Sequence, residues 1–393
     1  MNKWILSLPA LIVLALLCGV PAGAEAPVRI FLATDTHHLS PALTDYGPLF
    51  DDLVTNHNDG KLTERSRELV DAFLEKARAE RADVVILTGD LTFNGELQSL
   101  LELTEKLKAL WDGGIPVLVI PGNHDTSSRQ ARTCFGSKAG QTETFTQEDF
   151  TRICSCLGRD QALARDEDSF SFIYEAGSGL WLLMLDANTD RAPIGRLPAS
   201  TLKWLEDWLK KAQEQGKTVL SFSHQNLLPV NKLYYYQFTI ANCREVLDLY
   251  RRYGVRYSFS GHSHIQHRTE ADGLTEYVTG PLCVTPMHYA VITVGGGETV
   301  YEARTLGLYR EEALERFRAP VLSGMRAALE TCPATEEERE LMAEMAADVN
   351  TAYFGGDWDT IRSLKDGPAW ELWQTKGKTT AWFTYLWSIF EEY

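Results

Sequence analysis

The 393-residue sequence has few cysteines and no surplus of positive charge. Its 38 lysines and arginines face 54 aspartates and glutamates, a formal net charge of −16. The phosphate backbone of a long nucleic acid repels such an acidic chain unless metal ions intervene, so we expect no such partner. None of the seven cysteines lies in a C-x-x-C pair, so the cysteines indicate neither a zinc site nor a thioredoxin-type redox site.

Internal repeats and low-complexity stretches are also absent. No segment recurs at the fixed period of a solenoid, and 44% apolar with 10% aromatic residues exclude a mostly disordered or collagen-like chain. The length is about twice that of a typical domain or more. We therefore expect a soluble globular protein with one large domain and an appendage.

The N-terminus carries a long apolar run. Lys3 precedes it, the run extends over residues 4–18, and small residues fill positions 20–24. This pattern predicts a signal peptide over residues 1–24 that is cleaved after Ala24, which implies an exported protein, either secreted or in the cell envelope or periplasm.

Two membrane-anchored alternatives are less favoured. An uncleaved anchor needs about 20 apolar residues, and proline and glycine interrupt this run. A lipid anchor at Cys18 is less favoured because bulky Leu17 stands where a lipobox has a small residue. We expect no transmembrane span in the mature chain.

Six cysteines remain after residue 24. An even number in an exported chain permits disulfides, but free cysteines also serve as small buried apolar residues, so the sequence leaves both states open. The six are Cys134, Cys154, Cys156, Cys243, Cys283 and Cys332.

Short apolar runs alternate with helical patterns through residues 25–307, which predicts right-handed crossovers and a mostly parallel sheet. The expected strands are 28–34, 84–88, 117–120, 219–222 and 257–259, and the expected helices are 63–81, 96–111, 201–215 and 242–253. Further runs at 181–185, 275–278, 290–294 and 300–304 predict a second sheet packed on the first.

The sequence changes character near residue 308. Helix-forming segments dominate residues 308–393, so we expect a C-terminal helical domain whose aromatic residues serve mainly for packing and which can mediate contact with another protein. The helix-forming segments are 311–329, 335–354, 359–375 and 380–393, and they are punctuated by Pro333, Gly355-Gly356 and Gly367-Pro368. The connection over residues 40–61 is longer than usual and is expected to lie near Asp35.

A residue able to bind metal follows each of the five expected strands. Because ligands in α/β sheets gather at the carboxyl ends of strands, these side chains should converge in space. Their carboxylate, carboxamide and imidazole groups suit manganese, iron or zinc. The residues are Asp35 and His37, Asp90, Asn123, His224, and His262 with His264.

The local sequences at these points resemble the motif set of the calcineurin-like metallophosphoesterase superfamily. They are Asp35-Thr36-His37, Gly89-Asp90, Gly122-Asn123-His124-Asp125, His224 and Gly261-His262-Ser263-His264. The resemblance implies a four-layer αββα sandwich and two divalent metal ions. It assigns Asp35, His37, Asp90 and His264 to one ion, and Asp90, Asn123, His224 and His262 to the other, with Asp90 bridging.

The same resemblance implies roles for the residues after Asn123. His124 is expected to assist the leaving group or stabilise charge on the phosphoryl oxygens, and Asp125 to orient the ring of His124. His38 and His267 stand beside motif residues and are weaker candidates for substrate contact.

Further motifs are similar to exported bacterial phosphodiesterases of the cyclic-nucleotide-phosphodiesterase-like branch, which also carry a C-terminal helical domain. These motifs are Asp59-Gly60-Lys61 and the segment from Gly89 to Glu96. The chain departs from the branch at Gln225, where members often have a second histidine, so a substrate contact at that position is in doubt.

These observations predict an exported dimetal phosphodiesterase that hydrolyses small diesters by attack of metal-bound hydroxide. Cyclic nucleotides are one candidate class of these diesters. One alternative is a phosphomonoesterase or nucleotidase on the same site. Another is a catalytically silent metal-binding scaffold.

Overall fold

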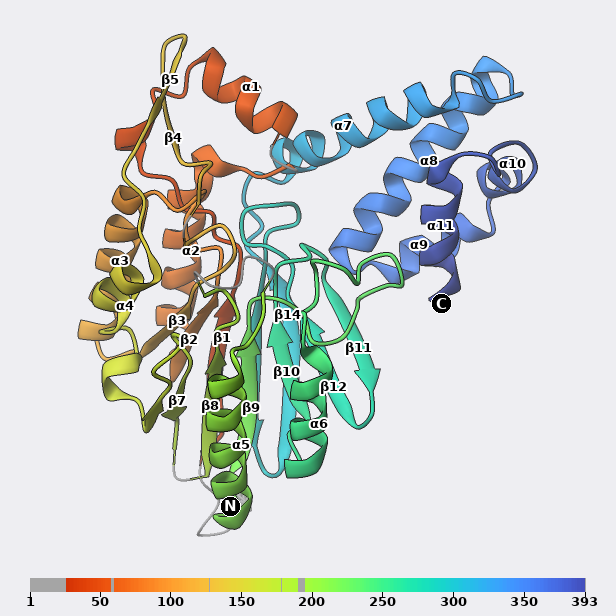
Figure 1. The fold of residues 1–393 in the computed structure, drawn as a ribbon. Helices are drawn as coiled ribbons and strands as arrows, with labels where there is room; N and C mark the ends of the chain where they lie inside the picture. The colour runs from red at the N-terminus through yellow and green to blue at the C-terminus, as the bar shows by residue number, and fades with distance from the viewer. Residues whose placement is uncertain (1–25, 58–59, 127, 178, 190–194, 393) are drawn as a thin grey trace, which may run out of the picture.

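The computed structural model describes residues 26–57, 60–126, 128–177, 179–189 and 195–392. The predicted signal peptide and Cys18 lie outside these residues. Figure 1 shows a body of strands and flanking helices beside a group of helices formed by the last part of the chain.

The first sheet has five strands in the order β14-β13-β1-β2-β3. Strands β1, β2 and β3 run parallel, and β13 and β14 continue the sheet in antiparallel register. Their bounds are β1 Val28–Ala33, β2 Val84–Thr88, β3 Val117–Ile120, β13 His288–Gly295 and β14 Glu298–Thr305. Every residue of β2 and β3 is buried, which explains their uninterrupted apolar sequences.

The second sheet has seven strands in the order β11-β12-β10-β9-β8-β7-β6. Its centre, from β12 to β8, is parallel, and antiparallel strands extend both edges. The bounds are β6 Ala164–Arg165, β7 Phe172–Glu175, β8 Leu180–Leu185, β9 Thr218–Ser223, β10 Tyr257–Ser260, β11 His267–Ala271 and β12 Leu274–Val278.

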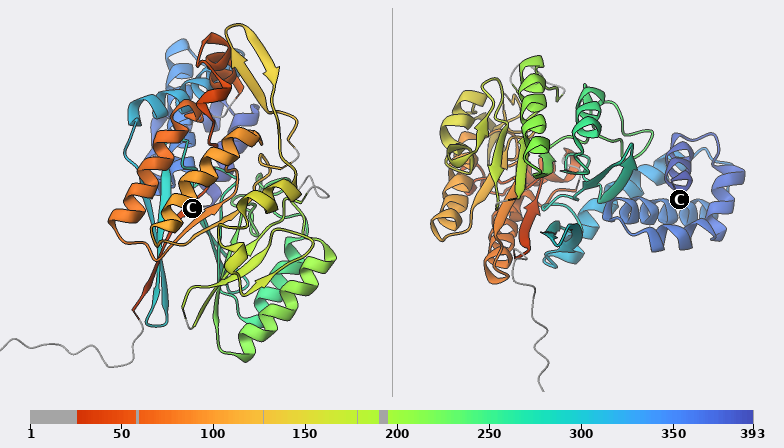
Figure 2. Two further views of the ribbon diagram at one scale, coloured as in Figure 1. Left: turned by 90° about the vertical axis from the view of Figure 1, so that its left-hand side faces the viewer. Right: turned by 90° about the horizontal axis from the view of Figure 1, so that it is seen from below.

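The two sheets pack face to face and carry helices on their outer faces, which confirms the expected four-layer sandwich (Figure 2, left). Strand β8 shows why: Leu182 and Met184 join the core between the sheets, whereas Leu183 and Leu185 join the core under the outer helices. The outer helices are α2 Ser66–Ala79 and α3 Leu97–Asp112 on one side and α5 Ala199–Glu214 and α6 Cys243–Tyr253 on the other.

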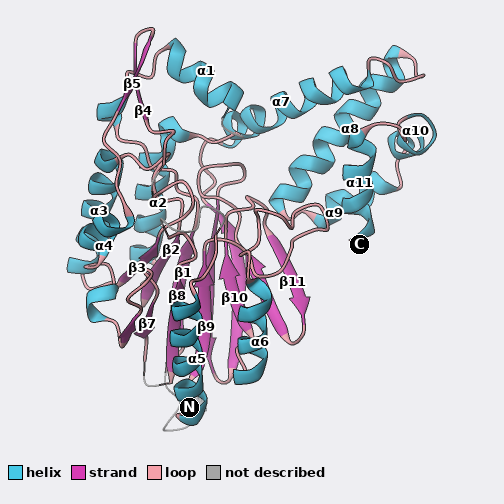
Figure 3. Ribbon diagram, viewed as in Figure 1, coloured by secondary structure: helices cyan, strands magenta, loops and turns pink. Residues whose placement is uncertain are grey.

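Smaller elements that the sequence analysis did not predict lie in the connections. They are helix α1 (Pro48–His57), the hairpin of β4 (Arg132–Phe135) and β5 (Lys138–Gln141), and α4 (Gln147–Cys154). Helix α1 and the hairpin stand above the carboxyl ends of the first sheet (Figure 3). They are short, at four to ten residues each, so their sequences give few repeats of a hydrophobic pattern.

Five helices form the expected C-terminal helical region. They are α7 Arg310–Leu329, α8 Glu336–Gly355, α9 Trp358–Lys365, α10 Pro368–Lys376 and α11 Ala381–Glu391. The region has its own core, in which Met342, Trp373 and Ile389 are fully buried, and Val230 and Ile265 of the sheet-bearing body extend that core. In the described part of the chain, no helix combines the length and apolar character that crossing a bilayer requires.

The expected membership of the two sheets is wrong for four strands. Runs 290–294 and 300–304 extend the first sheet, whereas 219–222 and 257–259 lie in the second sheet with 181–185 and 275–278. Gly367 and Pro368, which punctuate the helix-forming segment 359–375, separate α9 from α10, because proline is suited to the first position of a new helix. The six cysteines of the described residues, which the sequence left open, are all free thiols.

Candidate active site

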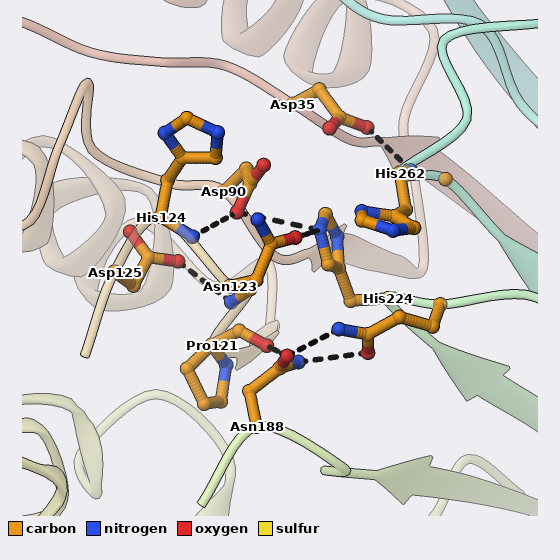
Figure 4. A network of polar contacts seen from close by, with 12 residues as sticks. Asp35, Asp90, Pro121, Asn123, His124, Asp125, Asn188, His224 and His262 are labelled. Carbon is orange, nitrogen blue, oxygen red and sulfur yellow. Dashed lines mark hydrogen bonds and ion pairs between the residues drawn. The ribbon is translucent and has the colours of Figure 1, made fainter. Parts of the chain in front are cut away.

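The seven predicted ligands come from the carboxyl ends of five strands in both sheets. Asp35 and His37 follow β1, Asp90 follows β2, Asn123 follows β3, His224 follows β9, and His262 and His264 follow β10. The sandwich brings these ends to one edge of the molecule. Figure 4 shows the close approach of Asp35, Asp90, Asn123, His224 and His262.

Asp35, His37 and His264 form the first cluster of possible metal ligands. His264 Nε2 lies 3.2 Å from Asp35 Oδ1, and His37 Nε2 lies 3.9 Å from the same oxygen. Both ring nitrogens of His37 are buried without a hydrogen-bond partner among the described residues. A buried polar group normally finds a partner, so these nitrogens fit a site for a cation.

Asp90 and His224 form a second cluster with Asp35. The Nδ1–H of His224 donates to the Thr88 carbonyl at 2.8 Å, which directs Nε2 into the site. Nε2 lies 3.0 Å from Asn123 Oδ1 and 3.3 Å from Asp90 Oδ1. In the neutral tautomer all three atoms carry lone pairs, so a proton or a metal ion must lie between them.

The electrostatics of the two clusters favour a cation. Burial opposes ionisation of Asp90, but the neighbouring imidazoles, His224 first, hold the pKa of its carboxyl well below the usual value. Burial likewise disfavours the charged form of His224, yet Asp90 and Asp35 raise the pKa of that imidazole to about 9. The carboxylates therefore stay ionised, and a divalent ion can replace the proton on His224.

His262 lies beside the second cluster, and its ring contacts a backbone carbonyl outside the cluster. Its backbone N–H donates to Asp35 Oδ2 at 3.1 Å, and its ring centroid lies 5.0 Å from that of His224. The ring Nε2–H donates to the Gln237 carbonyl at 2.8 Å. The predicted ligand role of His262 therefore depends on Nδ1.

Close packing of the loops after β2 and β3 brings Asp90 and Asn123 near each other. A Cβ atom on Gly122 would lie 2.2 Å from the backbone nitrogen and from Oδ1 of Asp90. Only glycine lets the loop after β3 approach the loop after β2 this closely.

His124 borders the clusters, but Asp125 does not orient its ring as the sequence analysis expected. The Nδ1–H of His124 donates to Asn94 Oδ1 at 2.9 Å and to the Phe93 carbonyl at 3.2 Å. Asp125 instead accepts hydrogen bonds from the backbone N–H groups of Leu91, Thr92 and Gly122. Its carboxylate therefore ties the loops after β2 and β3 together, and Asn94 orients the ring.

Gln225 is buried and has a structural role. Its side chain exchanges hydrogen bonds with Asn188, whose Nδ2 also donates to the Pro121 carbonyl at 3.1 Å (Figure 4). The pair supports the loop that carries Asn123. The buried amide of Gln225 is therefore fully used within the protein.

Two weaker candidates for substrate contact do not reach the site. His38 is fully buried, with Nε2 3.9 Å from Glu102 Oε2. His267 packs on Tyr353 and Trp358 of the helical region, at ring-centroid distances of 6.3 and 5.7 Å.

A cavity of about 410 Å³ opens on the clusters. Lys61, only 4% exposed, is the sole lysine or arginine among its described lining residues, and no described carboxylate pairs with its ammonium group. Lys61 and Asn94 stand within two of the sequence motifs, but the motifs alone predicted no role for either residue. The full lining is Gly60, Lys61, Asp90, Asn123, His124, Tyr234, Phe238, His262, Ser263, His264, Phe317, Pro320, Val321, Asn350 and Phe354.

A larger cavity, of about 840 Å³, lies at the opposite ends of the strands, where Val28 begins β1 and Thr218 begins β9. Its described lining contains no histidine or aspartate. The ionisable groups that can perform chemistry converge on the smaller cavity.

Known proteins resemble this chain in sequence and in fold. Residues 28–266 match the family described as Calcineurin-like phosphoesterase. The 3',5'-cyclic adenosine monophosphate phosphodiesterases CpdA of Escherichia coli K12 and O157:H7 are 23% identical over 271 residues, which cover 68% of this chain and 81% of theirs. A dimetal phosphatase from Danio rerio has a similar fold, with a TM-score of 0.55 and 15% identity over 71% of this chain and 96% of that one.

The family match spans more than half of the chain and includes every strand end that carries a predicted ligand. The donor set of the two clusters, carboxylate and imidazole, suits divalent metal ions. The chain therefore belongs to the Calcineurin-like phosphoesterase family and is a metal-dependent phosphoester hydrolase.

Proposed function

We propose that this protein is a phosphodiesterase that acts on small phosphodiesters, with two divalent ions, manganese, iron or zinc, held by the seven strand-end residues. The observation that carries the proposal is the charge of the cavity beside the clusters. Lys61 is the one lysine or arginine of its described lining, and apolar side chains make up much of the rest. A diester has one negative charge and two substituents, whereas a monoester approaches two charges near neutral pH.

The residues around the clusters have separate tasks in this reaction. When bound, the two ions polarise the phosphoryl group and make a water molecule more acidic. Lys61 pairs with a non-bridging phosphoryl oxygen. His124, protonated at Nε2 while its Nδ1–H donates to Asn94, gives the Nε2 proton to the leaving oxygen as the ester bond breaks. Asp125 keeps the two ligand-bearing loops in register.

The relatives suggest one class of substrate. The Escherichia coli proteins are 3',5'-cyclic adenosine monophosphate phosphodiesterases, so cyclic nucleotides are the first class that we propose to screen. At 23% identity the relatives do not identify the base of the substrate or the size of its cyclic phosphate ring, so the screen must vary both.

The decisive test compares hydrolysis of bis(p-nitrophenyl) phosphate with that of p-nitrophenyl phosphate by the stripped and manganese-reconstituted protein. We expect manganese-dependent preference for the diester. Asp90→Ala, which removes the carboxylate shared by both ligand sets, should lose bound metal and nearly all turnover, whereas exposed Asp207→Asn should retain both.

Preference for the monoester would replace the proposal with the phosphatase or nucleotidase alternative. Metal-loaded protein that cleaves neither compound nor any screened cyclic nucleotide would favour the silent scaffold.

We also propose that the protein is exported. The basic, apolar and small-residue segments of residues 1–24 support this localisation. Mass spectrometry of the protein recovered from its producing cells should find Glu25 as the first residue. A chain that retains residues 1–24, or a lipid on Cys18, would contradict cleavage after Ala24.

A further inference from the structure

The cavity beside the metal clusters has a second wall, and the C-terminal helical region provides it. Phe317, Pro320 and Val321 of α7 and Asn350 and Phe354 of α8 line the same 410 Å³ cavity as Asp90 and His124. These helices lie outside residues 28–266, the part that matches the family. The site is thus composed of the family fold and a region outside the residues that match the family.

Direct contacts hold this wall against the body. Arg316 pairs with Glu64 at 2.5 Å, on the segment that carries Lys61. The backbone N–H of Gln266 donates to the Phe354 carbonyl at 2.9 Å, and Gln266 lies on the loop after β10 that carries His264. Figure 1 shows α7 running from the body to the helical group, so its first half lies over the ends of the strands.

The wall offers aromatic surface from two sides. On α7 and α8, the rings of Phe317 and Phe354 lie 5.2 Å apart, and on the loop after β9, the rings of Tyr234 and Phe238 lie 4.9 Å apart. Both pairs line the cavity. Such surfaces favour a flat aromatic group, because stacked or edge-on ring pairs gain energy beyond simple burial.

One polar group accompanies the aromatic residues. Asn350 is buried, and its Oδ1 accepts a hydrogen bond from the hydroxyl of Tyr385 at 2.7 Å. With Oδ1 occupied, the amide NH₂ is the group that Asn350 offers to a ligand. Lys61 supplies the positive charge of the same cavity.

We propose that the helical region completes the substrate site and selects phosphodiesters that carry a planar aromatic substituent. In this arrangement the phosphoryl group lies between the metal clusters and Lys61, and the ring lies against α7 and α8. A cavity of about 410 Å³ is at the small end of ligand sites, which range from about 300 to 1,000 Å³, so the ligand is a small molecule rather than a protein segment. This inference rests on the proposed phosphodiesterase function.

Binding of two phosphonates to the full-length manganese-loaded protein tests the ring site without turnover. Phenylphosphonate and methylphosphonate have the same anionic group and differ only in the ring. By isothermal titration calorimetry we expect phenylphosphonate to bind about tenfold more tightly or better, since burial of the ring adds apolar contact. Equal affinities for the two compounds would overturn the proposal.

Two substitutions locate the ring. Val321→Trp should fill the cavity and Val321→Asn should make its wall polar, so each should reduce the preference for phenylphosphonate over methylphosphonate severalfold. Leu314→Trp is the control, because Leu314 is exposed on α7 outside the cavity. Thermal unfolding checks that each variant is folded.

The turnover of the same variants separates this inference from the proposed function. Val321→Asn, which makes the wall polar at nearly constant volume, should lower the ratio of kcat/KM for bis(p-nitrophenyl) phosphate to kcat/KM for the aliphatic diester glycerophosphoethanolamine at least about tenfold. An equal loss on both diesters, or no loss on either, would refute the ring site while the enzyme remains a phosphodiesterase. Failure of the unaltered enzyme on every diester would instead refute the proposed function.

Discussion

Five of the seven predicted metal ligands adopt a backbone conformation that L-residues normally avoid. The φ angles of Asp35, His37, Asp90, His262 and His264 lie between 40° and 64°. Each such residue costs on the order of 1–2 kcal/mol, and the surrounding packing must supply that energy. The strain occurs where the chain leaves a strand and turns toward the clusters, and this turn lets the predicted ligands lie close together.

His124 and Asn94 give the first prediction at this scale. His124→Ala should retain the metal and lower kcat by about 10² to 10⁴, because it removes the proton-exchanging group but no metal ligand. Asn94→Ala should lower kcat less, about tenfold, and shift the pH profile, because the ring keeps the Phe93 carbonyl as a partner. Metal analysis and pH–rate profiles measure both. Loss of metal from His124→Ala would show that His124 is a ligand.

Lys61 gives the second prediction, in which activity and stability change in opposite directions. A buried ammonium group without a carboxylate partner among the described residues costs folding free energy, so Lys61→Met should raise the unfolding temperature. The same change should raise KM for bis(p-nitrophenyl) phosphate about tenfold or more, because the phosphoryl oxygen loses its cation.

Lys203→Met, at an exposed lysine of α5, should change neither the unfolding temperature nor KM. Unaltered kinetics in Lys61→Met would show that the ammonium group does not touch the substrate.

At the scale of elements, β12 supports the loop after β9. The Glu276 carboxylate accepts the backbone N–H groups of Leu227 and Leu228 and the hydroxyl of Ser260. Glu276 is fully buried, and desolvation raises the pKa of its carboxyl to about 7. This loop continues to Tyr234 and Phe238 of the cavity wall. The hydrogen bonds of Glu276 therefore help to position these two residues.

The raised pKa of Glu276 therefore predicts that the free energy of unfolding depends on pH. The folded state binds the proton more tightly than the unfolded chain, whose glutamate pKa is near 4.5. The contribution is fully present below about pH 4.5 and is lost as the pH rises through about 7, on the order of 3 kcal/mol in total.

Urea unfolding of Glu276→Gln should show a flatter dependence on pH between 5 and 7.5 than the unaltered protein. Exposed Glu148→Gln serves as the control. An identical slope in Glu276→Gln and the unaltered chain would assign the dependence to another group.

At the scale of the molecule, the seating of α7 on the body depends on Gly60. Its φ angle is +78°, and a Cβ atom there would lie 2.9 Å from the backbone of Phe317. Gly60→Ala should displace α7, raise KM for bis(p-nitrophenyl) phosphate severalfold and retain bound metal.

Gly273→Ala controls for backbone strain alone, because Gly273 has a φ angle of +84° and no neighbour within 4 Å of the added atom. Both variants should lose stability of the order of 1 kcal/mol or more. Only Gly60→Ala should change KM, and the same change in Gly273→Ala would show that strain, not contact, is responsible.

Much of the fold was predictable because its elements have local causes. Apolar runs such as 84–88 and 117–120 were placed at their observed bounds, since strands covered on both faces need continuous apolar sequence. Gly367 and Pro368 already marked the break between α9 and α10 in the sequence, because proline is suited to the first position of a helix. The hairpin of β4 and β5 was missed because its exposed residues carry no period.

The sequence by itself determined the family, the layered sandwich and which residues end its strands, because each of these depends on patterns a few residues long. Only the tertiary structure decided that Asn94 rather than Asp125 holds the ring of His124, and that the helices of the C-terminal region line the cavity of Lys61. The Arg316 guanidinium donates a hydrogen bond to the Lys61 carbonyl across 255 residues of sequence. No local pattern encodes such a contact, because it depends on how complete elements pack.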